Sequence, residues 1–298
     1  MAKPLKTKGL SPGLDASKAA ALSLETHLLQ LSDQLVLASA GDTNGIHDAR
    51  VASKRLREVL RFARTWAPKE AYTLALQPVQ TLNDGLGPIR DRDVMKSHLT
   101  ELVASHPDLK RALKGLDVAL REERKAALCR LPEALSSAEQ ELSPRIHALC
   151  RLLRKVKKAP SLKNAIRRQL SKRLLRLLDD LDLALLEADA VAFHQRRLLA
   201  KRVKYTLEPW LPVLSAAAGR LRNEVAELQE LMGLARDWEV LRARLEEGTK
   251  AARTNRAGLL TAVHEADARR RDYTTQALVV LRRLAEGTLA AEVREHLT

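Results

Sequence analysis

Apolar residues recur along most of this chain at intervals of three and four positions, which is the spacing of one face of an α-helix. The segment 14–40 shows this pattern first. Its apolar side is formed by Leu28, Leu29, Leu31, Leu35 and Leu37. The chain contains no convincing run of alternating β-branched residues, which would be typical of a half-buried strand. The pattern therefore predicts an all-α protein.

Glycines and prolines divide the pattern into segments, because they cap or break helices. The breaks expected in the first half are residues 41–45, Pro68, Gly85 to Pro88, His106 with Pro107, Pro132 and Pro144. The helices expected in the second half cover about residues 161–188, 190–208, 212–232, 234–248 and 252–286. Each half thus offers at least four amphipathic helices, which suit a helical bundle.

The basic segment 155–161 is the best boundary between the two halves. It gives a flexible basic tail at residues 1–13, a first helical repeat at 14–157 and a second at 158–298.

A basic phrase occurs once in each half, at positions 147 apart. The copies are His47, Arg50, Lys54, Arg55 and Arg57 in the first half and His194, Arg197, Lys201, Arg202 and Lys204 in the second. A second phrase follows each copy, at an offset of 146, with Gly87, Arg90 and Asp91 and then Gly233, Arg236 and Asp237. Two motifs that recur in the same order at nearly one offset indicate an internal duplication.

Each basic phrase separates two kinds of side chain on one helix. Because a helix turns by about 100° per residue, the basic side chains of the first copy fall in a sector about 80° wide. These are His47, Arg50, Lys54, Arg57 and Arg61, and Arg55 lies beside the sector. Ala52, Leu56 and Leu60 lie on the opposite side. One side of the helix is therefore expected to pack while the other presents cations.

The composition agrees with a site for a strongly anionic partner. The chain has 52 Lys and Arg against 37 Asp and Glu, a net charge of +15 and a pI of about 10.1. Like charges along one helix face repel each other, and a counter-anion relieves that cost. Arg forks onto two phosphate oxygens and Lys supplies a compact charge. Nucleic acid, anionic membrane and polyphosphate are the candidate partners, and a solvated basic face is the alternative.

The histidines and the acidic residues allow more than one reading. His47 and His194 suit donation to a phosphate oxygen or a packing role better than metal ligation, which needs several convergent donors. Gly87 with Pro88, and Gly233, are read as helix starts. Acids in a first turn favour the positive end of the helix dipole. The acidic residues expected in such first turns are Asp91, Asp93, Asp237 and Glu239. The second option for them is pairing with the basic helix.

Several other classes are disfavoured by the sequence. Cys129 and Cys150 form no zinc or redox motif and are expected to be reduced, partly buried thiols. No signal peptide and no run of about 20 apolar residues that could span a bilayer are present. The chain lacks a P-loop, a carboxylate cluster and a nucleophile constellation, so we expect no enzyme. The cluster Arg167, Arg168, Lys172, Arg173 and Arg176 either lines the anion site or forms a solvated face.

Together, the two phrases resemble the CHAD domain (conserved histidine α-helical domain) in both halves. The resemblance covers essentially all of the chain beyond the tail. It implies an all-α fold of two similar antiparallel four-helix bundles, related by a pseudo-two-fold around a basic central cavity. It also implies binding of inorganic polyphosphate and a location on polyphosphate granules. Lys54 and Lys201 stand where the family has Arg, and Glu239 stands for Asp, so the departures keep the charge.

We therefore expect a cytoplasmic protein that binds inorganic polyphosphate without turnover and uses no cofactor and no metal. The residues expected to bind it are His47, Arg50, Lys54, Arg55, Arg57, Arg61, Arg90, His194, Arg197, Lys201, Arg202, Lys204 and Arg236. Family members are often fused to a CYTH hydrolase β-barrel, but no such strand pattern occurs here, which favours a stand-alone binding domain. The alternative is a nucleic-acid-binding protein, which the 3% of aromatic residues disfavours because bases stack on aromatic rings.

Overall fold

The computed structural model describes residues 5–252 and 254–295, and every regular element in these ranges is a helix. The elements in chain order are α1 (Ala16–Ser39), α2 (Thr43–Ala63), α3 (Lys69–Ser105), η1 (Pro107–Leu109), α4 (Lys110–Arg154), α5 (Leu162–Leu178), α6 (Leu183–Ala188), α7 (Ala190–Leu207), η2 (Glu208–Val213), α8 (Ala216–Ala251), α9 (Arg256–Glu286) and α10 (Leu289–Glu295). The all-α prediction is confirmed.

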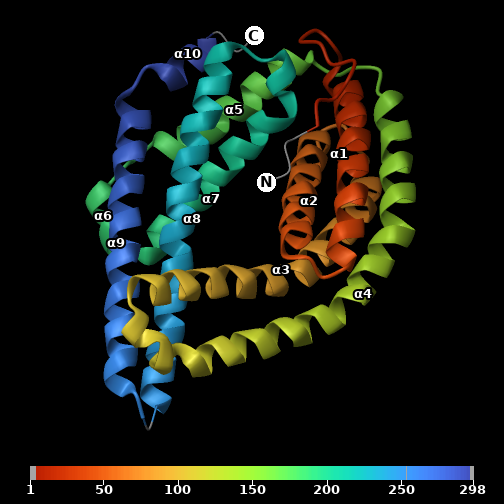
Figure 1. The fold of residues 1–298 in the computed structure, drawn as a ribbon. Coiled ribbons are helices and arrows are strands. Elements are labelled where there is room, and N and C mark those ends of the chain that lie inside the picture. The colour runs from red at the N-terminus through yellow and green to blue at the C-terminus, as the bar shows by residue number, and fades with distance from the viewer. Residues whose placement is uncertain (1–4, 253, 296–298) are drawn as a thin grey trace.

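The helices form two groups that meet in the middle of the molecule. In the first group, α1 packs against α2 and α4, and α3 packs against α2 and α4. In the second, α7 packs against α5 and α8, and α8 packs against α9. The groups lie on the right and the left of Figure 1, and α3 and α4 run from the first group to the lower parts of α8 and α9. The two helices that carry the basic phrases, α2 and α7, contact each other where the groups meet.

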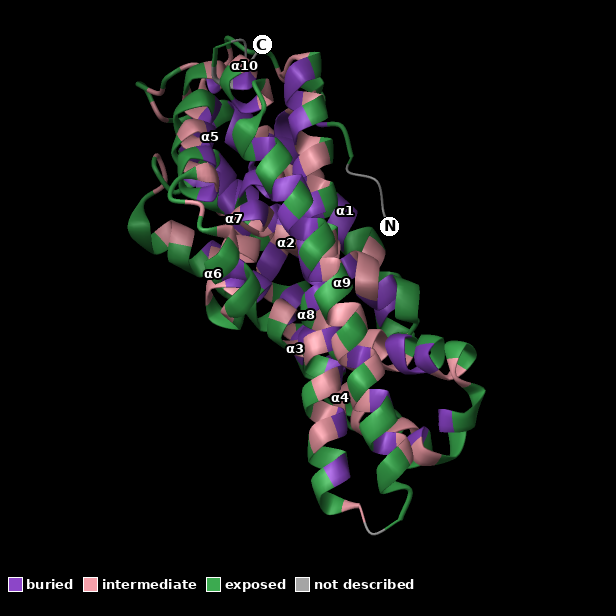
Figure 2. Ribbon diagram, turned by 90° about the vertical axis from the view of Figure 1, so that its left-hand side faces the viewer, coloured by how far each residue is buried: buried purple, intermediate pink, exposed green. Residues whose placement is uncertain are grey.

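The apolar core runs through both groups rather than stopping between them. The larger cluster of buried residues draws on α1, α2, α4, α5, α7 and α8. Trp210 is fully buried in it and lies 4.7 Å, between ring centroids, from Phe62 of α2. A smaller cluster around Trp238 joins the far ends of α3 and α4 to α8 and α9. Figure 2 shows the buried residues concentrated around α1, α2 and α7, while the lower tip of the molecule is largely exposed.

Four expected helix breaks are wrong, because long helices run through them. Pro88 lies inside α3, Pro132 and Pro144 lie inside α4, and Gly233 lies inside α8. An interior glycine costs about 1 kcal/mol and an interior proline about 3 kcal/mol in a helix. Burial of one large apolar side chain contributes about 1.5–3 kcal/mol. Leu82, Leu86 and Ile89 are all fully buried beside Pro88, so tertiary packing outweighs the local penalty.

The second half contains one break that the sequence pattern did not predict. Instead of one helix over 161–188, α5 ends at Leu178 and α6 begins at Leu183. Between them, Asp180 adopts a left-handed backbone conformation with φ of 46°. Asp182 then caps α6 by accepting a hydrogen bond from the backbone N–H of Leu185. Short polar residues tolerate this conformation and favour caps, which explains the interruption.

Two smaller expectations are corrected at single residues. Leu29 and Leu37 were placed on the apolar side of the first helix, but they are 65% and 53% exposed. Of the two free cysteines, Cys150 is buried as expected, whereas Cys129 is exposed. Burial raises the pKa of the Cys150 thiol to about 12.

The segments before α1 and between α4 and α5 lie against each other. The backbone N–H of Lys163 donates to the carbonyl of Pro12, and that of Leu162 donates to the carbonyl of Leu14. Of the expected tail at 1–13, residues 1–4 lie outside the described residues, and 5–13 form turns rather than a helix.

Candidate functional site

The basic faces of α2 and α7 begin at equivalent N-terminal caps. Asp42 accepts a hydrogen bond from the backbone N–H of Gly45 at 2.6 Å and starts α2. Asp189 accepts one from that of Val191 at 2.7 Å and starts α7. In each helix the histidine of the basic phrase follows the capping aspartate by five positions. The two caps therefore set equivalent starting points for the two basic faces.

The centre of the site is a group of five cations that face one another, which we call the basic row. It consists of Arg50, Lys54 and Arg57 on α2 with Arg197 and Lys201 on α7. Burial, together with the charges of Lys201, Arg50 and Arg197, lowers the pKa of Lys54 to about 6. Burial, Arg197, Arg57 and Arg50 lower the pKa of Lys201 to about 8. The cations thus lie close enough to destabilise each other's charge.

Several donors of the basic row are buried without a hydrogen-bond partner. They are Nη1 of Arg50, Nε of Arg57, Nε of Arg197 and, at the end of the row, Nδ1 of His194, none of which bonds to any described residue. A buried donor that is left unsatisfied costs about 1–3 kcal/mol. An anion with many acceptor oxygens would satisfy these donors and relieve the repulsion between the cations at once.

Helix α3 holds the guanidinium of Arg50 in place. Nη2 of Arg50 lies 3.6 Å from a carboxylate oxygen of Asp91. A Cβ atom added to Gly87 would lie only 2.9 Å from Nη1 of Arg50, so the glycine leaves the space that the guanidinium occupies. At Gly233 the nearest atom is the amide nitrogen of Gln229 at 4.0 Å, and no such approach occurs.

The acids of the second phrase are not in first turns, so their expected role at a helix start is wrong. They lie inside α3 and α8 because those helices run on through Pro88 and Gly233. The second option, pairing with the basic helix, is observed for Asp91, which faces Arg50. Asp93 and Glu239 pair with arginines of other helices. Asp93 binds Arg124 of α4, which also donates to the carbonyl of Gly41 just before α2. Burial raises the pKa of Asp237, while Arg197 opposes that shift.

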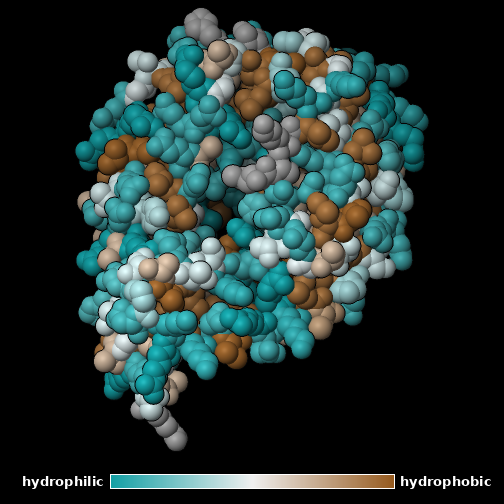
Figure 3. Space-filling view, viewed as in Figure 1, coloured by the Kyte–Doolittle hydropathy of each residue, from teal (hydrophilic) through white to brown (hydrophobic). Residues whose placement is uncertain are grey.

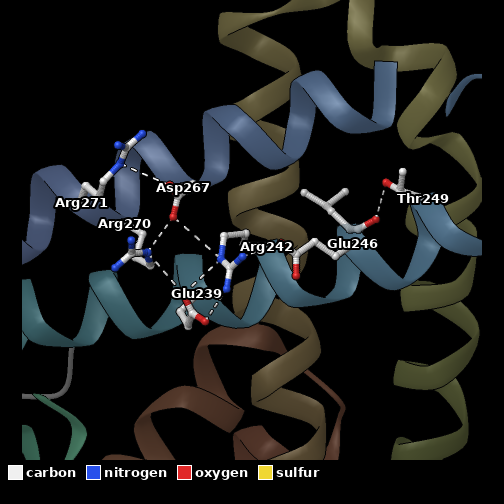
Figure 4. A network of polar contacts seen from close by, with 8 residues as sticks. Glu239, Arg242, Glu246, Thr249, Asp267, Arg270 and Arg271 are labelled. Atoms are coloured by element: carbon white, nitrogen blue, oxygen red, sulfur yellow. Dashed lines mark hydrogen bonds and ion pairs between the residues drawn. The ribbon is translucent and has the colours of Figure 1, made fainter. Parts of the chain in front are cut away.

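Glu239, the last of these acids, is fully engaged by arginines. It binds Arg242 through two hydrogen bonds of 2.9 and 3.2 Å, and its other neighbour is Arg270 of α9 at 3.3 Å. Asp267 completes this network, which Figure 4 shows between α8 and α9. The arginines lower the pKa of Glu239, so the carboxylate stays charged.

The two histidines lie at one end of the basic row. Burial lowers the pKa of His47, and Arg90 lowers it further. Burial also lowers the pKa of His194, with added effects of Arg197 and Arg236. Both rings are therefore uncharged at neutral pH in the free protein. Each can donate one hydrogen bond to an anion and would gain a proton beside a strong negative charge.

Arg90 and Arg236 flank the histidines. Arg90 is half-buried, and burial lowers its pKa against the opposing effects of Asp93 and Asp237. Arg236 is exposed and lines a cavity of about 120 Å³ together with His194, Phe193 and Arg270.

Not every predicted site residue reaches the basic row. Arg55 points the other way into a buried ion pair of 3.1 Å with Glu208, in which the two side chains are 4% and 1% exposed. Lys204 donates to the side-chain oxygen of Gln229 at 2.9 Å. Arg61 binds Glu58 next to the end of the row, and Arg202 is exposed.

The arginine-rich cluster of α5 divides into two parts. Arg173 is half-buried and donates to Glu58 at 3.3 Å and to the carbonyl of Arg202 at 3.0 Å. The other four members, which are Arg167, Arg168, Lys172 and Arg176, are exposed. The sequence pattern missed Arg196, which donates to the carbonyl of Leu177 at the C-terminus of α5. It also missed Glu58, whose contacts to α5 have no signal in the spacing of charges along α2.

The described residues offer neither a metal site nor a membrane-spanning helix. In residues 5–252 and 254–295, no three His, Cys, Asp or Glu side chains gather as metal ligands would. Within the same ranges, no helix has the length and apolar character needed to cross a membrane.

Comparison with known proteins identifies the family. The sequence profile of the CHAD domain matches residues 20–246. The fold is similar to the crystal structure of the CHAD domain from the plant Ricinus communis, with a TM-score of 0.68 at 19% identity, covering 94% of this chain and 97% of the other. It is also similar to PptA from Streptomyces chartreusis, with a TM-score of 0.60 at 14% identity, covering 92% and 100%. No curated protein sequence matches the chain. The chain thus belongs to the CHAD domain family.

Proposed function

We propose that this protein binds inorganic polyphosphate along the basic row between α2 and α7, without turning it over. The observation that carries the proposal is the convergence of five cations from two helices, several with buried donors that bond to no described residue. Membership of the CHAD family, which is known for polyphosphate-related proteins, supports it.

The chemistry of the row suits a linear phosphate chain. Each internal unit carries about one negative charge and offers several acceptor oxygens, which match guanidinium forks and ammonium groups. The row is half-buried, so a thin chain without bases can reach it. Figure 3 shows a hollow in the middle of the face, bordered mainly by hydrophilic residues.

We infer that the two halves arose by duplication and form two similar four-helix bundles around this site. Matching caps precede the two basic helices at the same distance from the histidine. The order of contacts also matches, since α7 lies between α5 and α8 as α2 lies between α1 and α3. In this reading both halves contribute equivalent cations to one ligand.

We propose binding rather than hydrolysis because the nearby acids already serve the cations. Asp91 faces Arg50, and Asp237 lies beside Arg197 and Arg90. The role that follows is to hold the protein on polyphosphate granules in the cytoplasm.

Titration of a labelled long polyphosphate with a double-stranded DNA competitor identifies the ligand. Polyphosphate should bind at physiological salt, and an equal concentration of DNA phosphate should displace little of it. Efficient displacement would instead favour the nucleic-acid alternative. Release of orthophosphate during incubation with magnesium would contradict binding without turnover.

A further inference from the structure

A second surface lies away from the basic row, where α3 and α4 approach their junction at η1. A groove of about 720 Å³ runs between these helices, and we call it the α3–α4 groove. Its apolar lining consists of Leu99 and Val103 of α3, Pro107 of η1, and Leu113 and Val118 of α4. The junction lies at the lower left of Figure 1, below α2 and α7.

The lining is apolar and reachable from solvent. Leu99 and Leu113 form its floor at 3% and 1% exposure, and they belong to the smaller core cluster. Val118 lines the groove and is 49% exposed. An exposed apolar surface next to a formed concavity is typical of a binding site.

The charges around the groove have one dominant sign. Lys96, Lys110, Arg111 and Lys114 line it, and the side chains of these four make no ion pair or hydrogen bond within the described part of the chain. The acids among the lining residues are Asp108 and Asp117, and Asp117 is already bound by Arg121. The free charges around the apolar floor are therefore mainly positive.

From this combination we infer that the α3–α4 groove binds an acidic amphipathic helix of a partner protein. The lining on α4 extends from Lys110 to Arg121, which at 1.5 Å per residue is about 16 Å, or three helical turns. An amphipathic helix places side chains at i, i+3, i+4 and i+7 into such a groove. Its apolar face would cover Val118 and Val103, and its carboxylates would meet the four free cations. This inference does not depend on the proposed function of the basic row.

A model peptide tests the inference directly. The probe is a labelled 15-residue helix with Leu at i, i+3, i+4 and i+7 and Glu at most other positions. Fluorescence anisotropy should show saturable binding to the full chain. A peptide of the same composition in scrambled order should bind at least about tenfold more weakly, because only the ordered peptide has an apolar face.

Matched variants locate the peptide on the surface. Val118→Asp should weaken binding at least about tenfold, since it places a like charge and a polar group on the apolar wall. Val36→Asp makes the same change at a 71%-exposed position on α1 and should leave binding unchanged. The variant Arg50→Glu/Lys54→Glu/Arg197→Glu/Lys201→Glu should also keep it, because the basic row is not the site.

Three results would overturn the inference. They are equal binding of the ordered and scrambled peptides, equal binding by Val118→Asp and the unchanged chain, and loss of binding in the four-fold variant of the basic row. A concentration-dependent dimer that Val118→Asp abolishes would overturn it as well, because the groove would then hold a second copy of the chain.

Discussion

At the scale of single residues, Lys54 is the most sensitive group in the basic row. Its pKa of about 6 and that of about 8 for Lys201 mean that the free site holds fewer charges at pH 9 than at pH 6. A bound polyanion favours the charged ammonium and raises both pKa values. Binding at neutral pH is therefore coupled to proton uptake by these lysines and by His47 and His194.

Affinity for polyphosphate should consequently fall as the pH rises from about 6 to about 9. Isothermal titration in two buffers of different ionisation enthalpy measures the protons taken up at about pH 7.5. Lys54→Arg keeps its charge throughout and should reduce the uptake by close to one proton. Affinity that is independent of pH at constant ionic strength would contradict the linkage.

The same shift acts on stability with a definite sign. In the free protein Lys54 binds fewer protons folded than unfolded between about pH 6 and its ordinary pKa of 10.5. The free energy of unfolding therefore rises with pH across this window, as far as Lys54 contributes.

Gly87 matters because of the space it leaves for Arg50. Gly87→Ala should stabilise α3 by about 0.5–1 kcal/mol through helix propensity. It should nevertheless weaken polyphosphate binding about tenfold, or about 1.4 kcal/mol, because the methyl group displaces Nη1 of Arg50. Gly233→Ala makes the same change without that contact, and it should stabilise α8 and leave affinity unchanged. Thermal denaturation and direct binding of both variants check this, and equal affinities would remove the positioning role.

At the scale of elements, a buried ion pair ties α2 to η2 and α8. Arg55 donates to Glu208 at 3.1 Å, and Arg222 of α8 donates to the same carboxylate at 3.0 Å. This pair explains why Arg55, although part of the basic phrase, lies outside the basic row.

Arg55→Ala should lower the free energy of unfolding by about 3–5 kcal/mol, because it leaves a buried carboxylate with one cation fewer. Arg168→Ala, at an exposed site on α5, should change it by less than about 0.5 kcal/mol. Urea denaturation followed by circular dichroism gives both values. A similar loss of unfolding free energy in the two variants would mean that the ion pair stabilises the protein no more than an exposed arginine does.

The helices that could be predicted from the sequence are those with clear local signals. Both α2 and α7 have an aspartate at the N-cap and a basic face opposite an apolar one, and both lie where the pattern placed them. The interiors of α3 and α8 could not be predicted, because Pro88 and Gly233 carry the local signal for a break. Burial of Leu86 and Met232 against other helices overrides that signal, and it is not visible in the local sequence.

In the candidate site, too, the features with a local sequence signal could be predicted, and those that depend on packing could not. Helical spacing placed Arg50, Lys54 and Arg57 on one face, and the fold brings that face to Arg197 and Lys201. Spacing did not show that Lys204 would turn to Gln229, or that Arg173 of α5 would bind Glu58. Those contacts depend on how helices from distant parts of the chain pack together. A helical wheel describes one helix and does not show this packing.

At the scale of the whole molecule, the net charge of +15 attracts any polyanion, whereas the basic row contributes specific contacts. Log affinity falls as log salt concentration rises. By analogy with single-stranded nucleic acid, each phosphate contact makes this fall steeper by about 0.7. Lys201→Gln should therefore make the salt dependence shallower by about 0.7. Lys172→Gln, at an exposed position on α5, should leave it unchanged. Equal slopes for the two variants would mean that the general field, and not the row, holds the ligand.

The most direct test compares charge reversal in the row with the same reversal elsewhere. One variant changes Arg50, Lys54, Arg197 and Lys201 to Glu, and the control changes Arg167, Arg168, Lys172 and Arg176, which are exposed on α5. Both alter the formal net charge equally, and circular dichroism should show unchanged helicity in each. We predict that titration with long polyphosphate shows binding abolished in the first variant and kept, at somewhat lower affinity, in the control. Equal affinities of the two variants would contradict the assignment of the site between α2 and α7.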